Sequence, residues 1–132
     1  MKIRESGMPT EEIWETFFKP SKVLKTLNLD RETNDVVDFG CGYGTFTIPV
    51  AKIVGGKVYA IDIEPEMVEE TKRKVRENRL NNVETILRDF VSSGSGLKNG
   101  SVDYVMLFNI LHAKEPEKLL REAYRILRNG GK

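Results

Sequence analysis

The chain has 132 residues, enough for one domain with a single hydrophobic core. Its 21 basic and 20 acidic residues nearly cancel and form no long run of one sign, which argues against a nucleic-acid-binding or membrane-surface protein. The single cysteine, Cys41, excludes an internal disulfide, and no secretory or membrane-length apolar segment is present, so a cytoplasmic location is expected.

The first part of the chain predicts two short helices. Apolar residues recur at helical spacing over residues 10–18, and Pro20 interrupts this pattern. Ser21 can cap a second helix. We therefore expect a helical segment over residues 1–34 and a separate core over residues 35–132.

Strand and helix patterns alternate through this core. The predicted strands are Asp35–Phe39, Lys57–Ile63, Val83–Leu87 and Val102–Ile110. The predicted helices are Thr45–Val54, Glu66–Leu80 and a last helix opened by Pro116, whose inward residues are Leu119, Leu120, Ala123, Ile126 and Leu127. Val91–Gly100, rich in Gly and Ser, predicts a loop with little order of its own. The alternation predicts an α/β fold with a parallel sheet and right-handed crossovers.

The most informative motif, VVDFGCGYGTF, covers the end of the first predicted strand. Its alternating glycines, Gly40, Gly42 and Gly44, let a ligand approach the main chain because no Cβ stands in the way. If a helix follows, its free N–H groups form an electropositive rim. Asp38 beside the loop favours a ligand with positive charge, and Asp62 ends the next apolar run. Together these features indicate a nucleoside-containing ligand with a cationic part.

The order of these motifs resembles that of the class I S-adenosylmethionine-dependent methyltransferases. Asp38 and the glycines match the first motif of that family, and Asp62 matches the acid that binds the ribose hydroxyls. Asp89 and Phe90 match the pair that contacts the adenine, and Asn109 falls where the family lines the methionine and methyl region. The expected fold is a Rossmann-like sheet of strand order 3-2-1-4.

The resemblance implies S-adenosyl-L-methionine as cofactor, S-adenosyl-L-homocysteine as product and a small-molecule methyl acceptor. The implied cofactor-binding residues are Asp38, Phe39, Gly40, Cys41, Gly42, Gly44, Asp62, Ile63, Asp89, Phe90 and Asn109. It also implies that the N-terminal helices can form a lid over the acceptor pocket. No catalytic residue is assigned, and no metal site is predicted.

Plain structural roles compete with several of these assignments. Asp62 can cap the helix that follows it, and Phe90 can anchor the core. His112, the only histidine, is more simply a loop residue than a proton acceptor.

Two other functions stay open. A nicotinamide-dependent oxidoreductase also has a glycine-rich first turn, although Gly-x-Gly-x-Gly differs from Gly-x-Gly-x-x-Gly and Asp38 suits a pyrophosphate poorly. A non-catalytic cofactor-binding module is the second alternative.

The sequence ends at Lys132, where the resemblance predicts a fifth strand. The family sheet normally has the order 3-2-1-4-5-7-6, so a fragment of a longer protein is the favoured explanation. The fourth predicted strand then has a long apolar edge over Tyr104–Ile110, which predicts a homodimer or a strand exchange through that edge.

Overall fold

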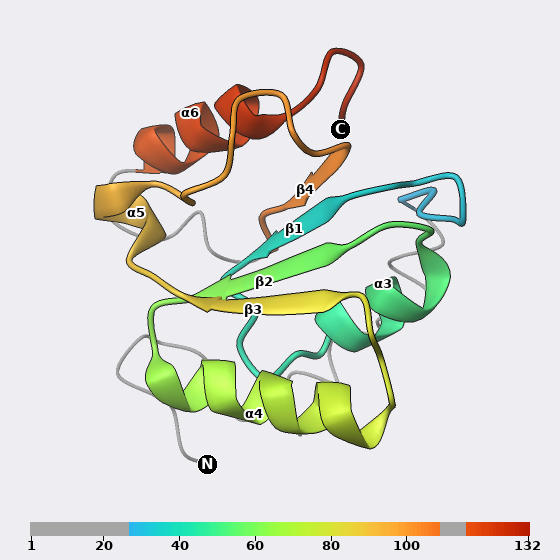
Figure 1. The fold of residues 1–132 in the computed structure, drawn as a ribbon. Helices are drawn as coiled ribbons and strands as arrows, with labels where there is room; N and C mark the ends of the chain where they lie inside the picture. Colours follow the sequence, from blue (N-terminus) through green and yellow to red (C-terminus); the bar gives the residue numbers. More distant parts are fainter. Residues whose placement is uncertain (1–26, 109–115) are drawn as a thin grey trace.

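The computed structural model describes residues 27–108 and 116–132, which form an α/β fold (Figure 1). The elements in chain order are β1 (Val36–Phe39), α3 (Thr47–Ile53), β2 (Val58–Asp62), α4 (Pro65–Glu77), β3 (Val83–Leu87), α5 (Phe90–Ser93), β4 (Tyr104–Met106) and α6 (Pro116–Ile126). The strands pair in parallel in the order β3-β2-β1-β4. The predicted fold class and strand order are confirmed. The predicted N-terminal helices, Asn109 and His112 lie outside the described residues.

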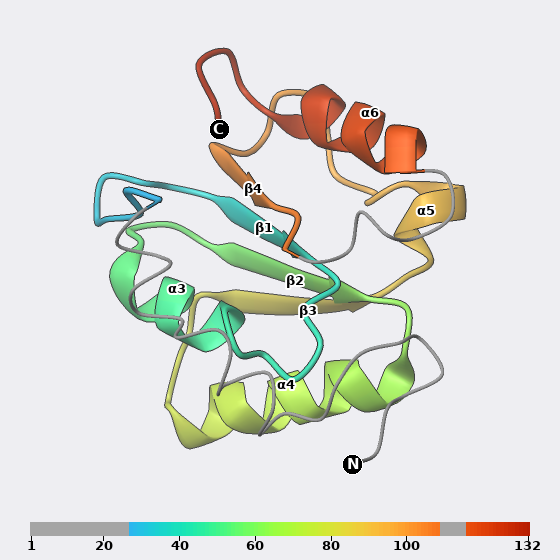
Figure 2. The same ribbon diagram turned by 180° about the vertical axis from the view of Figure 1, so that it is seen from behind.

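Helices cover both faces of the sheet (Figures 1 and 2). On the face of α3 and α4, the larger buried cluster is Leu29, Val36, Phe46, Val50, Ala51, Val54, Val58 and Met106. On the face of α5 and α6, the buried cluster is Val37, Phe39, Ile61, Phe90, Val102, Leu119 and Ile126. Neighbouring residues of one strand point to opposite faces, so both faces of the sheet need apolar residues. This is why the central strands are almost continuously apolar.

The ends of α4 show how the local sequence sets an element. Pro65 occupies its first turn, where the missing N–H has no helical acceptor to lose, and Glu64 precedes it in an extended conformation. The helix ends at Glu77, three residues before the predicted end at Leu80, because Arg79 adopts a left-handed φ of 53°.

The predicted loop Val91–Gly100 has more order than expected. Its first residues belong to α5, and side chains from other elements hold the rest. Arg88 Nε donates to the Gly94 carbonyl at 2.7 Å. Ser95 donates to Glu122 on α6 through both its N–H, at 2.7 Å, and its hydroxyl, at 2.6 Å. The prediction was wrong for residues 91–93, which belong to α5, whereas residues 94–100 form a loop as predicted. The hydrogen bonds that hold this loop were not predicted, because Gly and Ser content carries no information about partners distant in sequence.

The fourth strand is shorter than the predicted range Val102–Ile110. Only β4 pairs with β1, while Val102 forms an isolated parallel bridge with Leu127. Phe108, which follows β4, packs rather than pairs as a strand: its ring contacts the Phe46 ring at a centroid distance of 4.7 Å.

One inward-facing prediction for α6 is wrong. Leu119, Ala123 and Ile126 are buried, but Leu120 is 49% exposed. Positions 119, 123 and 126 follow one helical stripe, and position 120 lies to one side of it.

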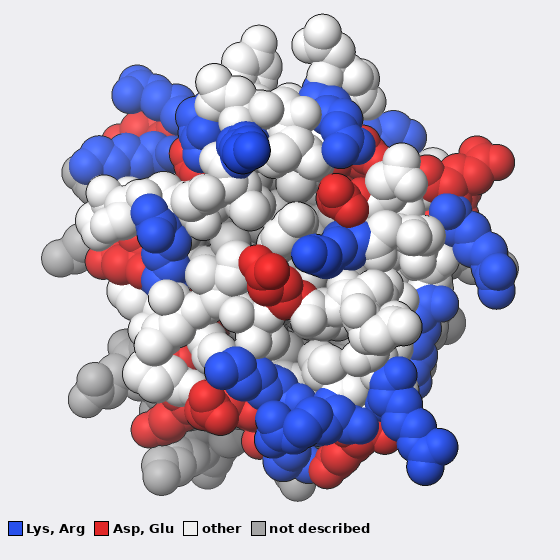
Figure 3. Space-filling view, viewed as in Figure 1, with Lys and Arg blue, Asp and Glu red and all other residues white. Residues whose placement is uncertain are grey.

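The surface carries charges of both signs over the face shown in Figure 3. Among the residues that the structure describes, no helix is long and apolar enough to cross a membrane.

The homodimer through the fourth strand stays a prediction. The C-terminal residue Lys132 already occupies part of the free edge of this strand. The Val105 N–H donates to the Lys132 carbonyl at 2.9 Å, and the Lys132 N–H donates to the Asp103 carbonyl at 3.0 Å. We expect a concentration-dependent monomer–dimer equilibrium in analytical ultracentrifugation, since apolar strand edges pair readily. A monomer at all concentrations, with little binding of a hydrophobic dye, would contradict this expectation.

Candidate functional site

The glycine loop, defined as residues 40–44, connects β1 to α3 at the carboxyl end of the sheet. Gly40, Gly42 and Gly44 have φ values of 70°, 56° and 80°, in the left-handed region where a side chain is strained. The Gly40 N–H donates to the Ile61 carbonyl at 2.7 Å, which holds the loop against the end of β2. The alternating glycines are thus required by the backbone itself.

Asp38 lies in β1 directly before this loop, and only 4% of it is exposed. The Thr47 hydroxyl donates to its Oδ2 at 2.7 Å. Burial raises the pKa of Asp38 to about 7, against the lowering effect of the Thr47 hydrogen bond, and the nearby charge of Asp62 raises it further. A buried carboxyl of this kind is stabilised in its ionised form by a positively charged ligand.

Asp62 connects the end of β2 to the glycine loop and to the start of α4. Its Oδ2 accepts from the Gly42 N–H at 2.9 Å, and its Oδ1 accepts from the Glu64 N–H at 2.9 Å. Burial raises the pKa of Asp62, while these two N–H bonds oppose the rise. The structure therefore shows a helix-entry role for Asp62 together with a loop-holding one, and each carboxylate oxygen still has a lone pair to offer.

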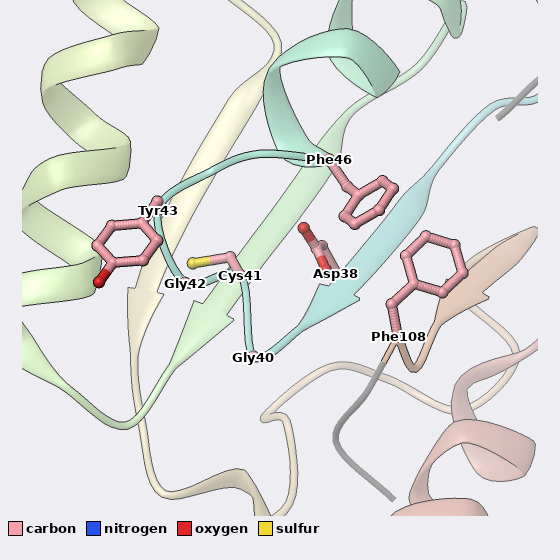
Figure 4. Close-up of a pocket in the computed structure, with 7 residues that line it drawn as sticks. All are labelled: Asp38, Gly40, Cys41, Gly42, Tyr43, Phe46 and Phe108. Atoms are coloured by element: carbon pink, nitrogen blue, oxygen red, sulfur yellow. The ribbon is translucent and has the colours of Figure 1, made fainter. Parts of the chain in front are cut away.

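A cavity lies beside the glycine loop (Figure 4). Its lining residues are Asp38, Gly40, Cys41, Gly42, Tyr43, Phe46 and Phe108. The carboxylate of Asp38 lies between Cys41 on one side and the facing rings of Phe46 and Phe108 on the other, while Tyr43 points away toward α4. An acidic group beside aromatic rings favours a cation, because both attract positive charge.

Other predicted site residues take structural positions. The Phe39 side chain is fully buried and packs against the buried Phe90, with ring centroids 5.1 Å apart, so both rings belong to the core. Asp89 caps α5 by accepting from the Ser92 N–H at 3.2 Å. Ile63, directly after β2, is 54% exposed. The structure brings together Asp38, the loop and Asp62, and it places Phe39 and Phe90 in the core.

Three threonines around the loop were missed as site residues. Thr47 donates to Asp38, and Thr71 Oγ1 donates to the Gly42 carbonyl at 3.0 Å. Within residues 27–108 and 116–132, the Thr45 hydroxyl is the one buried side-chain polar atom with no hydrogen-bond partner. The sequence did contain a signal for Thr47 and Thr71: each places a hydroxyl among the otherwise apolar residues of a helix face.

These groups fit a nucleoside with a cationic amino-acid part. The glycines leave no Cβ in the approach, the Thr45 hydroxyl is an unused hydrogen-bonding group, and Asp38 and Asp62 both suit hydroxyls or cations. The buried carboxyl of Asp38 beside the loop suits the pyrophosphate of a dinucleotide poorly.

The chain is similar in sequence and structure to several known methyltransferases. The sequence model of a family described as a methyltransferase domain matches residues 36–131. A solved S-adenosylmethionine-dependent methyltransferase from Aquifex aeolicus is 36% identical with a TM-score of 0.76, over 86% of this chain and 61% of that one. An M. jannaschii protein solved in complex with AdoMet is 30% identical with a TM-score of 0.67, over 83% of this chain and 48% of that one. The demethylmenaquinone methyltransferase of Geobacillus sp. (strain WCH70) is 30% identical over 112 residues, 83% of this chain and 47% of its own length.

The parallel sheet of order β3-β2-β1-β4 with helices on both faces defines a domain of Rossmann-like architecture. The chain belongs to the methyltransferase-domain family, in the class I S-adenosylmethionine-dependent group, and the predicted resemblance is confirmed. It spans between 33% and 47% of the length of the first curated relatives that it matches.

Proposed function

We propose that this chain binds S-adenosyl-L-methionine at the glycine loop and takes part in methyl transfer to a small-molecule acceptor. The observation that carries the proposal is the pair of buried acids at the glycine loop: Asp38 directly precedes the loop, and Asp62 accepts a hydrogen bond from the Gly42 N–H within it. The family membership supports the same conclusion. When bound, this cofactor would supply a methyl group on a positively charged sulfur. A nucleophile of the acceptor takes the methyl group by in-line displacement, and the neutral sulfur is the leaving group.

Each residue then has a proposed role in binding. Asp62 accepts the ribose hydroxyls, and Asp38 faces the positively charged end of the cofactor. Asp89 accepts from the adenine amino group, the Phe90 N–H donates to the ring, and Ile63 offers an exposed apolar side chain beside it. The protein mostly holds and orients the ligand, since the transferred group is already activated.

The acceptor is proposed to be an apolar molecule that contains a ring. The aromatic pair Phe46 and Phe108 supports this, because it forms an apolar wall of the cavity next to Asp38. Several relatives are named demethylmenaquinone methyltransferases, and that name also points to a ring-containing acceptor. A general base is needed only for an acceptor that must lose a proton.

Binding of S-adenosylhomocysteine, measured by isothermal titration calorimetry, tests the cofactor site. We expect the wild-type chain to bind it, and Asp62→Ala to weaken binding at least ~10-fold, because this change removes the ribose acceptor and the Gly42 partner together. Glu84→Ala is the matched control, since Glu84 is exposed on β3. No binding at high micromolar ligand, with no effect of Asp62→Ala, would refute the proposal.

Two further assays separate the alternatives. Enhanced NADH fluorescence would favour the nicotinamide-dependent oxidoreductase. Transfer of a labelled methyl group to a demethylated quinone analogue or a metabolite pool would favour the enzyme, whereas cofactor binding without transfer would favour a non-catalytic module.

A further inference from the structure

Gly42, at the centre of the glycine loop, forms hydrogen bonds through both its N–H and its carbonyl. Its N–H donates to Asp62 Oδ2 at 2.9 Å, and its carbonyl accepts from Thr71 Oγ1 at 3.0 Å. Asp62 belongs to β2 and Thr71 to the middle of α4. Two elements outside the loop therefore fix the orientation of this residue.

Thr71 contacts the loop from α4 but is not one of the residues that line the cavity. It is fully buried. A Cβ built on Gly44 would lie 3.2 Å from Thr71 Oγ1, which shows how closely α4 approaches the loop. Thr71 thus supports the loop without itself lining the cavity.

Cys41 completes a short chain of hydrogen bonds with Thr71. Its Sγ lies 3.6 Å from Thr71 Oγ1. Burial raises the pKa of the Cys41 thiol, so the thiol is protonated and donates to the hydroxyl, which in turn donates to Gly42. Both partners of the Thr71 hydroxyl are therefore in the glycine loop.

We propose that Thr71 is a positioning residue for cofactor binding. Its hydrogen bond to Gly42 keeps the glycine loop of the ligand-free protein in the conformation that binds the cofactor. This inference rests on the proposed function. Glycines lose more conformational freedom on ordering than any other residue, and the loop contains three of them. A loop that is already ordered loses less freedom on binding, so its affinity is higher.

Thr71→Val tests the role by removing the hydroxyl while keeping the shape of the side chain. We expect S-adenosylhomocysteine to bind roughly tenfold more weakly by isothermal titration calorimetry, and Thr71→Ser to restore affinity to within about threefold. In the ligand-free protein, amide hydrogen exchange over residues 40–44 is expected to become faster in Thr71→Val than in wild type. Thr85→Val is the matched control, since Thr85 lies on β3 at the far edge of the sheet.

The outcomes separate this role from the cofactor site itself. A wild-type chain that does not bind overturns the proposed function and the positioning role with it. A wild-type chain that binds, together with a valine variant of equal affinity or a serine variant as weak as valine, overturns the positioning role alone. If Thr71→Val does not fold by circular dichroism, Thr71→Ala compared with Thr71→Ser gives the same comparison.

Discussion

Asp38→Asn is expected to weaken binding of S-adenosylhomocysteine at least ~10-fold while making the ligand-free protein more stable at pH 8. The substitution keeps the size of the side chain and an oxygen that can accept from Thr47, but it removes the negative charge. The ammonium group of the ligand then has no carboxylate to face. Loss of affinity together with a gain in stability is typical of a residue retained for function.

The pH dependence of binding follows from the same carboxyl. Its pKa is about 7 in the ligand-free protein, and a bound cation favours the ionised form, so binding releases the proton. Below pH 7 this proton must be removed, and affinity for the ligand is expected to fall roughly tenfold between pH 7 and pH 5.5. The raised pKa of Asp62 acts in the same direction. Titration calorimetry in buffers of different ionisation enthalpy measures both the affinity and the proton release.

The pH dependence of stability has the opposite sense. The pKa of Asp38 in the folded protein is above its ordinary value of 3.8, so its proton stabilises the fold at low pH. This stability is lost as the pH rises through about 7. The free energy of unfolding of wild type is expected to fall by about 2–3 kcal/mol between pH 5 and pH 8 relative to Asp38→Asn.

Urea denaturation of the two proteins at pH 5 and pH 8 measures this difference. Asp30→Asn is the control, because Asp30 lies in an exposed turn before β1. A constant difference between wild type and Asp38→Asn across this range would contradict the assignment, as would equal affinity of the two proteins for the ligand at pH 7.5.

Gly56→Ala is expected to lower the free energy of unfolding by at least ~3 kcal/mol, measured by urea denaturation. A Cβ at this position would lie 2.4 Å from the carbonyl carbon and oxygen of Asn34, and 2.7 Å from Asp35 Oδ1. These are mostly backbone atoms of the segment that enters β1, so they cannot move without shifting the central strand. Gly56 is thus required for the close approach of the α3–β2 turn to that segment.

Gly130→Ala provides the matched control. Gly130 has a φ of 81°, but a Cβ there would have nothing within 4 Å. Its replacement should cost only about 1 kcal/mol, the strain of a left-handed alanine. Equal losses at Gly56 and Gly130 would contradict the explanation by close approach.

The positions of the strands and of the glycine loop could be predicted from the sequence for a simple physical reason, whereas the strand order was implied by the family resemblance. A parallel sheet covered on both faces needs strands with few polar residues, and Val36–Phe39 and Val58–Asp62 meet that need without reference to any other part of the chain. A loop that requires left-handed backbone needs glycine, so Gly40, Gly42 and Gly44 stand out in the sequence as well. Asp38 and Asp62 were then found by their place at the ends of strands.

The tertiary structure decided what depends on partners distant in sequence. The sequence predicted neither that Glu122 holds Ser95 and orders the Gly/Ser-rich segment, nor that Phe108 leaves the strand to pack on Phe46. Thr71 belongs to no motif in the sequence, and only the fold places its hydroxyl at the Gly42 carbonyl. Local sequence determines which conformations are favourable, whereas a hydrogen bond across 29 residues depends on where the packed helices and strands bring the two groups.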